Sequence, residues 1–171
     1  MGMTAQNLTD PQLAGTWALV PGRSSVRFTS KTLWGLIPVN GRFTDVTGEG
    51  VITAGGQLSG RLVIQADSVR TGIGKRDHHL QAEEFFDAER FPEIVVEVTG
   101  TAPDGTPIAT LSIRGTTLPL PLTFTVGRID ADSVAITARG QIDRTRWGVS
   151  GNMLGMMPPA TTLVTEAVFT R

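Results

Sequence analysis

Cysteine is absent from this chain of 171 residues, and its two histidines lie side by side as His78 and His79. The lack of thiols excludes disulfides, zinc–thiolate sites and a cysteine nucleophile. Charge is sparse and balanced, with 15 Lys and Arg against 16 Asp and Glu. Because the basic residues form no block or stripe along the sequence, the composition argues against a nucleic-acid partner.

Long apolar runs are missing as well. The most apolar stretches are Leu33–Val39 and Met153–Ala160, and both are broken by glycine and proline. A bilayer span needs roughly 20 consecutive apolar residues. Residues 1–15 have neither the charged start nor the apolar core of a signal peptide. The sequence as given therefore predicts a soluble, cytoplasmic protein.

Alternation of polar and apolar residues is what the sequence does have. In Ser133–Asp143, for example, Val134 and Ile136 alternate with Thr137 and Arg139, and similar segments recur from Trp17 onward. There are roughly eight of them, and half-buried antiparallel strands show this pattern. Their short links favour a barrel or a two-sheet sandwich. We expect a flexible N-terminal segment over residues 1–14 and one mainly β domain over 15–171.

Two segments depart from the alternation. Pro119 and Pro121 interrupt an apolar row between Leu118 and Val126, and proline has no backbone N–H to donate to a sheet. This stretch is therefore predicted to lie at a seam or mouth of the sheet. Residues 76–91 instead favour a helix that Asp77 caps and Pro92 stops, and such an insert is predicted to cover one mouth.

Five ordered sequence blocks between Trp17 and Gly148 carry a family resemblance. Their matching residues are Trp17, Pro21, Ser24, Val26 and Phe28; Val39, Gly41, Phe43 and Gly48; Arg76, Asp77, His79, Leu80, Phe85, Phe86, Asp87 and Pro92; Leu111, Ile113, Arg114, Gly115, Thr117 and Pro119; and Arg144, Trp147 and Gly148. In these blocks the chain resembles the YceI-like family of lipid-binding barrels, also described as polyisoprenoid-binding proteins. It departs from the family at Arg23, where histidine is common.

The resemblance implies an eight-stranded antiparallel, lipocalin-like β-barrel. It also implies a long apolar cavity that takes up an isoprenoid chain, such as that of a quinone, or another long-chain lipid. No catalytic residue set is implied, and relatives are often exported. We therefore expect a non-enzymatic carrier or storage protein whose bound lipid is its ligand, with no cofactor.

Candidate ligand-binding residues come from inward strand positions, from the helical insert and from two apolar loops. They are Phe28, Trp34, Ile37, Phe43, Phe85, Phe86, Phe91, Ile113, Leu120, Leu122, Phe124, Ile142, Met153, Met156 and Met157. Arg76, Arg114 and Arg144 are candidates for contact with a lipid head group, and pairing with carboxylates is the alternative. The loop around Trp34 and Ile37 leaves three interpretations open: mouth residues, homodimer contacts, or transient contact with a membrane surface.

The interior of an eight-stranded barrel is either filled or left open for one small ligand. Small residues at inward positions, namely Gly41, Ala66, Ala138 and Gly140, favour the open form. A barrel filled by its own side chains is the alternative, and it would indicate an interaction module.

Catalysis and metal binding have weaker support. Adjacent histidines on a helix point about 100° apart, so His78 and His79 are poorly placed to share one metal ion. There is no GxSxG motif for a serine nucleophile. A small hydrolase or isomerase acting in the same cavity remains an alternative, with Asp77, His79 or Asp143 as its acid or base.

Overall fold

The computed structural model describes residues 2–4, 8–32, 37–151 and 159–171, and these residues are mainly β. The strands are β1 (Gly2–Thr4), β2 (Gly15–Leu19), β3 (Ser25–Thr32), β4 (Ile37–Phe43), β5 (Val46–Ile52), β6 (Leu58–Gln65), β7 (Val69–Arg70), β8 (Glu93–Thr101), β9 (Pro107–Ile113), β10 (Thr116–Pro119), β11 (Thr123–Asp130), β12 (Ser133–Asp143) and β13 (Ala160–Thr170). The helical elements are α1 (Gly74–Leu80) and the 3-10 turns η2 (Pro11–Leu13), η3 (Pro21–Arg23), η4 (Ala66–Ser68) and η5 (Arg144–Trp147). None of the helices in the described ranges has the length and apolar character needed to cross a membrane.

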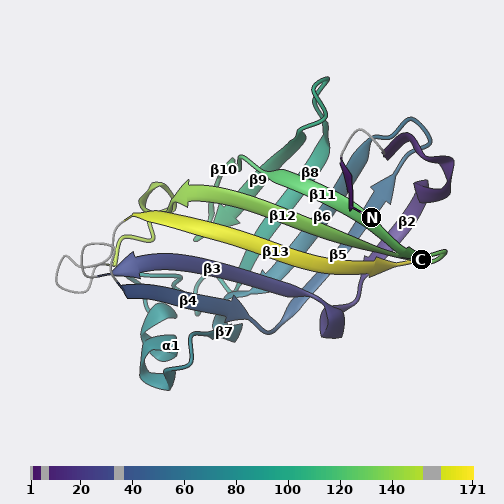
Figure 1. Cartoon of the computed structure of the whole chain (residues 1–171). Coiled ribbons are helices and arrows are strands. Elements are labelled where there is room, and N and C mark those ends of the chain that lie inside the picture. Colours follow the sequence, from purple (N-terminus) through teal and green to yellow (C-terminus); the bar gives the residue numbers. More distant parts are fainter. Residues whose placement is uncertain (1, 5–7, 33–36, 152–158) are drawn as a thin grey trace.

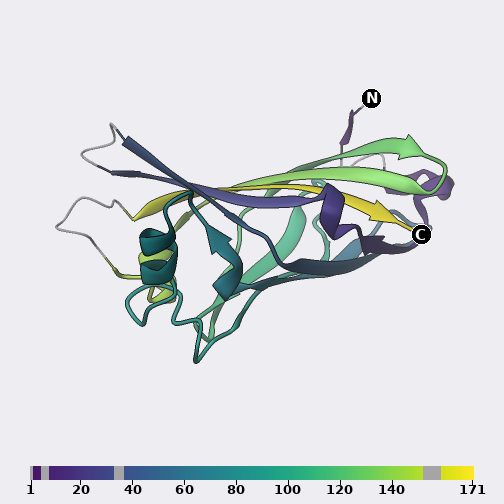
Figure 2. The same cartoon turned by 90° about the horizontal axis from the view of Figure 1, so that it is seen from below.

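One antiparallel sheet contains all the strands. Its main path runs β1-β11-β12-β13-β2-β5-β6-β8-β9-β10, and β3, β4 and β7 branch from β13. Figure 1 shows β12, β13, β3 and β4 side by side in front of β5, β6 and β8. Figure 2 shows these two layers facing each other, with α1 at one end and the C-terminus at the other. The layers bury their facing apolar residues against each other.

The sheet does not close, so the prediction of an eight-stranded barrel is only partly right. Between the described strands, β10 pairs with β9 alone, and no ladder joins it to the strands at the other end of the path. The structure has 13 strands because three long ones are each broken in two, and because the short β1 and β7 add to the number. The breaks fall at η3, at Thr44-Asp45 and at residues 120–122.

The break at residues 120–122 confirms the seam that the prolines predict. Leu120 N donates to Ala109 O at 2.9 Å, which continues the pairing with β9. Pairing with β12 begins at Thr123, opposite Arg139. Pro119 and Pro121 have no N–H to donate, and the chain changes partner between Leu120 and Thr123. One continuous stretch therefore borders both layers without forming a regular ladder between them.

The helical insert is shorter than predicted. Helix α1 begins at Gly74 and ends at Leu80, and residues 81–91 form a series of turns. Asp87 has a left-handed backbone with φ 49°, which no continuous helix tolerates. Asp77 is not the cap either. Its carboxylate accepts bonds from N and Oγ1 of Thr71, at 2.7 and 2.5 Å, and so fastens α1 to the chain that follows β7.

Part of the N-terminal segment packs against the sheet. Within residues 8–14, Leu8 and Leu13 are fully buried in a second apolar cluster with Trp17, Val126 and Val134. Trp17 Nε1 donates to Leu13 O at 2.9 Å. Residues 8–14 therefore cover one end of the sheet.

Replacing Gly140 with alanine is expected to destabilise the fold by about 1–3 kcal/mol, the usual cost of overpacking. An added Cβ would lie 2.7 Å from Pro121 O, where the backbone crosses β12 at the seam. Gly22→Ala is the control, because a Cβ there meets nothing within 4 Å. Urea unfolding followed by tryptophan fluorescence measures both, and equal stability of the two variants would contradict the close approach.

Candidate functional site

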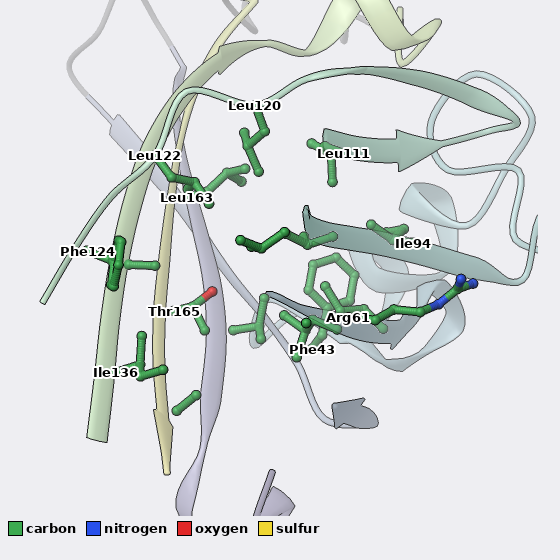
Figure 3. Close-up of a pocket in the computed structure, with 18 of the residues that line it drawn as sticks. Phe43, Arg61, Ile94, Leu111, Leu120, Leu122, Phe124, Ile136, Leu163 and Thr165 are labelled. Carbon is green, nitrogen blue, oxygen red and sulfur yellow. The ribbon is translucent and has the colours of Figure 1, made fainter. Parts of the chain in front are cut away.

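The space between the layers is a partly open cavity of about 220 Å³. A single buried water needs only about 10–15 Å³, so this cavity is large enough for many atoms. Its wall is almost wholly apolar. Figure 3 shows Leu122, Phe124 and Leu163 on one side, facing Ile94 and Leu111 on the other.

Alternation along the strands builds this wall. In β12, Ile136, Ala138 and Ile142 face the cavity, while Thr137 and Arg139 between them are exposed. β13 pairs with β12 residue for residue from Ser133↔Thr170 to Asp143↔Ala160, so its inward residues fall in line with those of β12. Because the side-chain period of a strand is two, this register fixes which residues can touch a ligand.

The end of the cavity beside α1 is aromatic. The ring centroids of Phe28 and Phe43 are 5.7 Å apart, and Phe86 lies 6.4 and 5.7 Å from them. Phe86 is half-buried, whereas Phe85 behind it is buried. These contacts place the turns after α1 across one end of the cavity, as the sequence predicts for the insert.

Small inward residues contribute less space than the sequence predicts. A Cβ on Gly41 would collide with the ring of Phe28, its cross-strand partner, so that ring already fills the position. Pro121 O occupies the space over Gly140. Ala66 is fully buried away from the wall, and Ala138 is the member of this group that lines it. The open space therefore comes from the separation of the two layers.

Arg144 is a charged side chain buried at the wall. The residue is 7% exposed, and its Nη1 donates to Val149 O at 2.6 Å. Burial lowers the pKa of Arg144, and the charge of Asp143 opposes this, but arginine keeps its charge in proteins. Ser30 and Thr161 share a buried hydroxyl hydrogen bond of 2.9 Å at the same end of β13. The described wall thus has a polar region made by Arg144 and these two hydroxyl groups, and Thr165 of β13 adds a further hydroxyl among the apolar side chains (Figure 3).

Other charged residues border the cavity with their backbones. Arg27, Glu49 and Arg61 are exposed residues of the strands that form the wall. Figure 3 shows the guanidinium of Arg61 directed away from the pocket. The interior itself therefore stays apolar.

The structure brings together most of the described residues predicted to bind the ligand. On the wall lie Phe28, Phe43, Phe85, Phe86, Ile113, Leu120, Leu122, Phe124 and Ile142. Phe91 is not among the lining residues and packs over Gly115 instead. Trp34, Met153, Met156 and Met157 lie outside the described residues, as does the side chain of Ile37. A role in binding stays a prediction for all of them.

Several lining residues were missed by the sequence analysis. They include Trp17, Val96, Val98, Leu111 and Phe169. Their strands alternate like the others, so the period-2 pattern offered a signal for Val96 and Val98. Trp17 lies in the short strand β2 and Phe169 near the end of β13, where alternation says little about which residues reach a cavity.

Two of the candidate head-group arginines hold the chain together away from the wall. Arg76 donates from Nε to Thr71 Oγ1 at 2.9 Å and from Nη2 to Thr71 O at 3.0 Å. Arg114 has a left-handed backbone in the β9–β10 turn and donates from Nη1 to Gly148 O. Arg144 is therefore the candidate that reaches the cavity.

The candidate acids and bases are engaged in local contacts. Asp77 binds Thr71, and His79 pairs with Glu84 at the surface. Asp143 is exposed and caps η5, and hydrogen bonds from the side chain and then the backbone of Thr145 hold its pKa below the ordinary value. A general acid near neutral pH needs a raised pKa, so Asp143 is poorly suited to that role. Within the described ranges no three His, Asp or Glu side chains are grouped to hold a metal ion.

Comparisons with known proteins agree with this architecture. A model of the YceI-like domain matches residues 17–169. BcnA of Burkholderia cenocepacia has a similar structure, with 19% identity, a TM-score of 0.77, and coverage of 88% of this chain and 98% of that one. A polyisoprenoid-binding domain of Saccharophagus degradans, implicated in plant cell wall breakdown, has 17% identity, a TM-score of 0.73, and coverage of 90% and 97%.

The YceI protein of Campylobacter jejuni is also similar, with 22% identity, a TM-score of 0.67, and coverage of 78% of this chain and 85% of that one. Among curated proteins, none matches this sequence. At such identities the structural likeness establishes the fold.

Replacing Arg144 with methionine is expected to lower the free energy of unfolding by about 1–3 kcal/mol, since it leaves the buried Val149 carbonyl without this donor. Arg146→Met is the matched control, because Arg146 is an exposed residue of the same turn. Urea unfolding of both variants measures the difference. A loss in Arg146→Met as large as that in Arg144→Met would contradict a special role for the buried guanidinium.

Proposed function

This chain belongs to the YceI-like domain family, and from that premise we propose that it binds a long apolar lipid in the cavity between its two layers. The ligand is polyisoprenoid in character, with an isoprenoid quinone as the leading candidate. The protein carries or stores this lipid without changing it chemically.

The apolar cavity between the layers is the observation that carries the proposal. Each methylene group moved from water into such an interior contributes roughly 0.8 kcal/mol, so a chain that is only partly enclosed still binds after the cost of association. The polar groups on the wall, a buried arginine and a few hydroxyls, can orient a small polar head but offer no polar contacts along a whole ligand. A ligand with a long apolar chain and a small polar head matches that distribution.

The choice of a polyisoprenoid as the ligand rests on similarity to a protein of known structure. The Saccharophagus degradans domain that shares this fold is described as polyisoprenoid-binding. Branched methyl groups along an isoprenoid chain also suit a wall made of leucine, isoleucine, valine and phenylalanine, whose branched and aromatic side chains leave an uneven surface. The polar region at Arg144 would then lie near a quinone carbonyl or another oxygen-bearing head.

The alternative functions have less support. An enzyme acting in the cavity would need an acid or base on the wall, whereas Asp77, His79 and Asp143 make local contacts elsewhere. A module with a self-filled interior would leave no cavity of about 220 Å³. Binding is therefore the function that the geometry favours.

Solvent extraction of the purified protein, followed by mass spectrometry, is expected to release a prenyl or other long-chain lipid in stoichiometric amount. Ala138→Phe should reduce that amount several-fold, because Ala138 lines the cavity and the larger side chain would occupy it. Thr137→Phe is the control, since Thr137 is exposed on the other face of β12. A lipid-free wild type that also fails to take up added prenyl quinones would overturn the proposal.

Affinity is expected to rise with the length of the apolar chain. At roughly 0.8 kcal/mol per buried methylene, each added methylene lowers Kd about four-fold until the cavity is full. Titration of the delipidated protein with a quinone series that differs only in the number of prenyl units measures this dependence. An affinity that changes with the head group but not with chain length would argue for recognition outside the cavity.

A further inference from the structure

The outer face of the front layer carries a row of arginines that the sequence does not reveal. In the ladders, Arg139 of β12 lies opposite Val164 of β13, which lies opposite Arg27 of β3. Arg27 lies opposite Arg42 of β4, and Arg42 opposite Arg70 of β7. We call Arg27, Arg42, Arg70 and Arg139 the arginine face. Figure 1 shows β12, β13, β3 and β4 adjacent to one another at the front, with β7 beyond β4.

All four side chains of the arginine face belong to exposed residues. Strands are spaced about 4.8 Å apart, so the row spans roughly 19 Å along the sheet. The inward neighbours in these strands, such as Phe28 and Phe43, line the cavity. The same alternation that builds an apolar interior therefore sets these cations in register on the outside.

A contribution to the stability of the fold does not explain why these four arginines lie in a row. Like charges placed directly opposite each other on neighbouring strands are destabilising. Arg27 has a partner in Glu166, with Nη2 3.0 Å from Oε1. Arg70 donates to the carbonyl oxygens of Asp67 and Val69. The described residues give Arg42, in the middle of the row, no ion pair, so a site of positive potential remains at its centre.

An exposed apolar side chain beside the cavity follows the last arginine of the row, Arg70, in the chain. The chain continues from Arg70 through Thr71 and Gly72 to Ile73, which is 53% exposed, and then to Lys75 at the start of α1. Lys75 is also exposed. Two cations thus flank an outward-pointing isoleucine, on the loop that enters the helix next to Phe86 and the aromatic end of the cavity.

We propose that the arginine face, together with Ile73 and Lys75, docks the protein on an anionic lipid surface. The inference rests on the proposed function, because a lipid carrier must meet the membrane that supplies or receives its ligand. Guanidinium groups bind phosphate oxygens in a bidentate manner, and each cation near an anionic bilayer strengthens attachment. Ile73 enters the interfacial region between the head groups.

A lipid surface fits these features better than a nucleic acid does. Sequence-independent nucleic-acid binding on a groove uses aromatic side chains for base stacking, whereas Ile73 is the large apolar side chain exposed beside the row. A cation row with one flanking aliphatic residue resembles the composition of interfacial membrane contacts. Docking on this face holds the α1 end of the cavity close to the lipid head groups.

Flotation of the full chain with vesicles tests the proposal. The protein is expected to float with vesicles made of equal parts phosphatidylcholine and phosphatidylglycerol, and not with phosphatidylcholine alone. Arg42→Gln combined with Arg70→Gln should weaken binding about 25-fold, from a roughly five-fold loss for each cation removed. Salt should weaken the wild type in the same direction.

Arg23→Gln combined with Arg61→Gln is the matched control, because both arginines are exposed and lie outside the row. It removes the same charge and should leave flotation nearly unchanged. Arg42→Lys combined with Arg70→Lys should retain most of the binding. Equal losses in the two Gln pairs, no flotation of the wild type, or tighter binding to a single-stranded oligonucleotide than to the anionic vesicles would each overturn the proposal.

Extraction of bound lipid from the same variants distinguishes docking on a lipid surface from lipid binding in the cavity. Normal lipid content with lost flotation in the Arg42/Arg70 pair supports docking as a separate property. Normal lipid content in a wild type that does not float overturns docking and leaves the cavity function intact. A wild type that floats but contains and binds no lipid overturns the cavity function instead.

Discussion

The uninterrupted pairing of β12 with β13 is the constraint on which the rest of the structure depends. Its register, from Ser133↔Thr170 to Asp143↔Ala160, contains no bulge. β11 attaches to β12, and β2 and β3 attach to successive parts of β13. A shift of one residue would turn every inward side chain of either strand outward. The apolar wall and the arginine face therefore depend on the same register.

The family motifs mark the contacts that hold the α1 end of the molecule together. Trp147 Nε1 donates to Leu111 O at 2.8 Å, and Arg114 donates to Gly148 O, so two bonds join η5 to the β9–β10 hairpin. Arg76 and Asp77 fasten α1 to Thr71. These residues join one element to another, whereas other motif residues, such as Phe28, Phe43 and Phe86, line the cavity. The motifs therefore include both the contacts that hold the fold and part of the cavity wall.

The strands and the wall were predictable from the sequence because both follow from local alternation. The seam was predictable too, since Pro119 and Pro121 have no backbone N–H donor in any environment. The breaks in the long strands and the turns after Leu80 were not, because they depend on tertiary contacts such as Phe86 packing on Phe28 and Phe43. The arginine face was hidden for a similar reason: its members are far apart in the chain and meet only through strand register.

An almost wholly apolar interior also limits how a ligand can be selected. Adding or removing one methylene in a hydrophobic pocket changes binding by only about 1–3 kcal/mol, so the wall distinguishes lipids by length and shape more than by chemical identity. The polar groups of Arg144, Ser30, Thr161 and Thr165 are the parts of the described wall that can favour one head group over another. Selection of the lipid source then falls to the exterior, where fixed charges determine which surface the protein meets. The residues that select the lipid and the residues that select the surface are therefore different, because they alternate along the same strands.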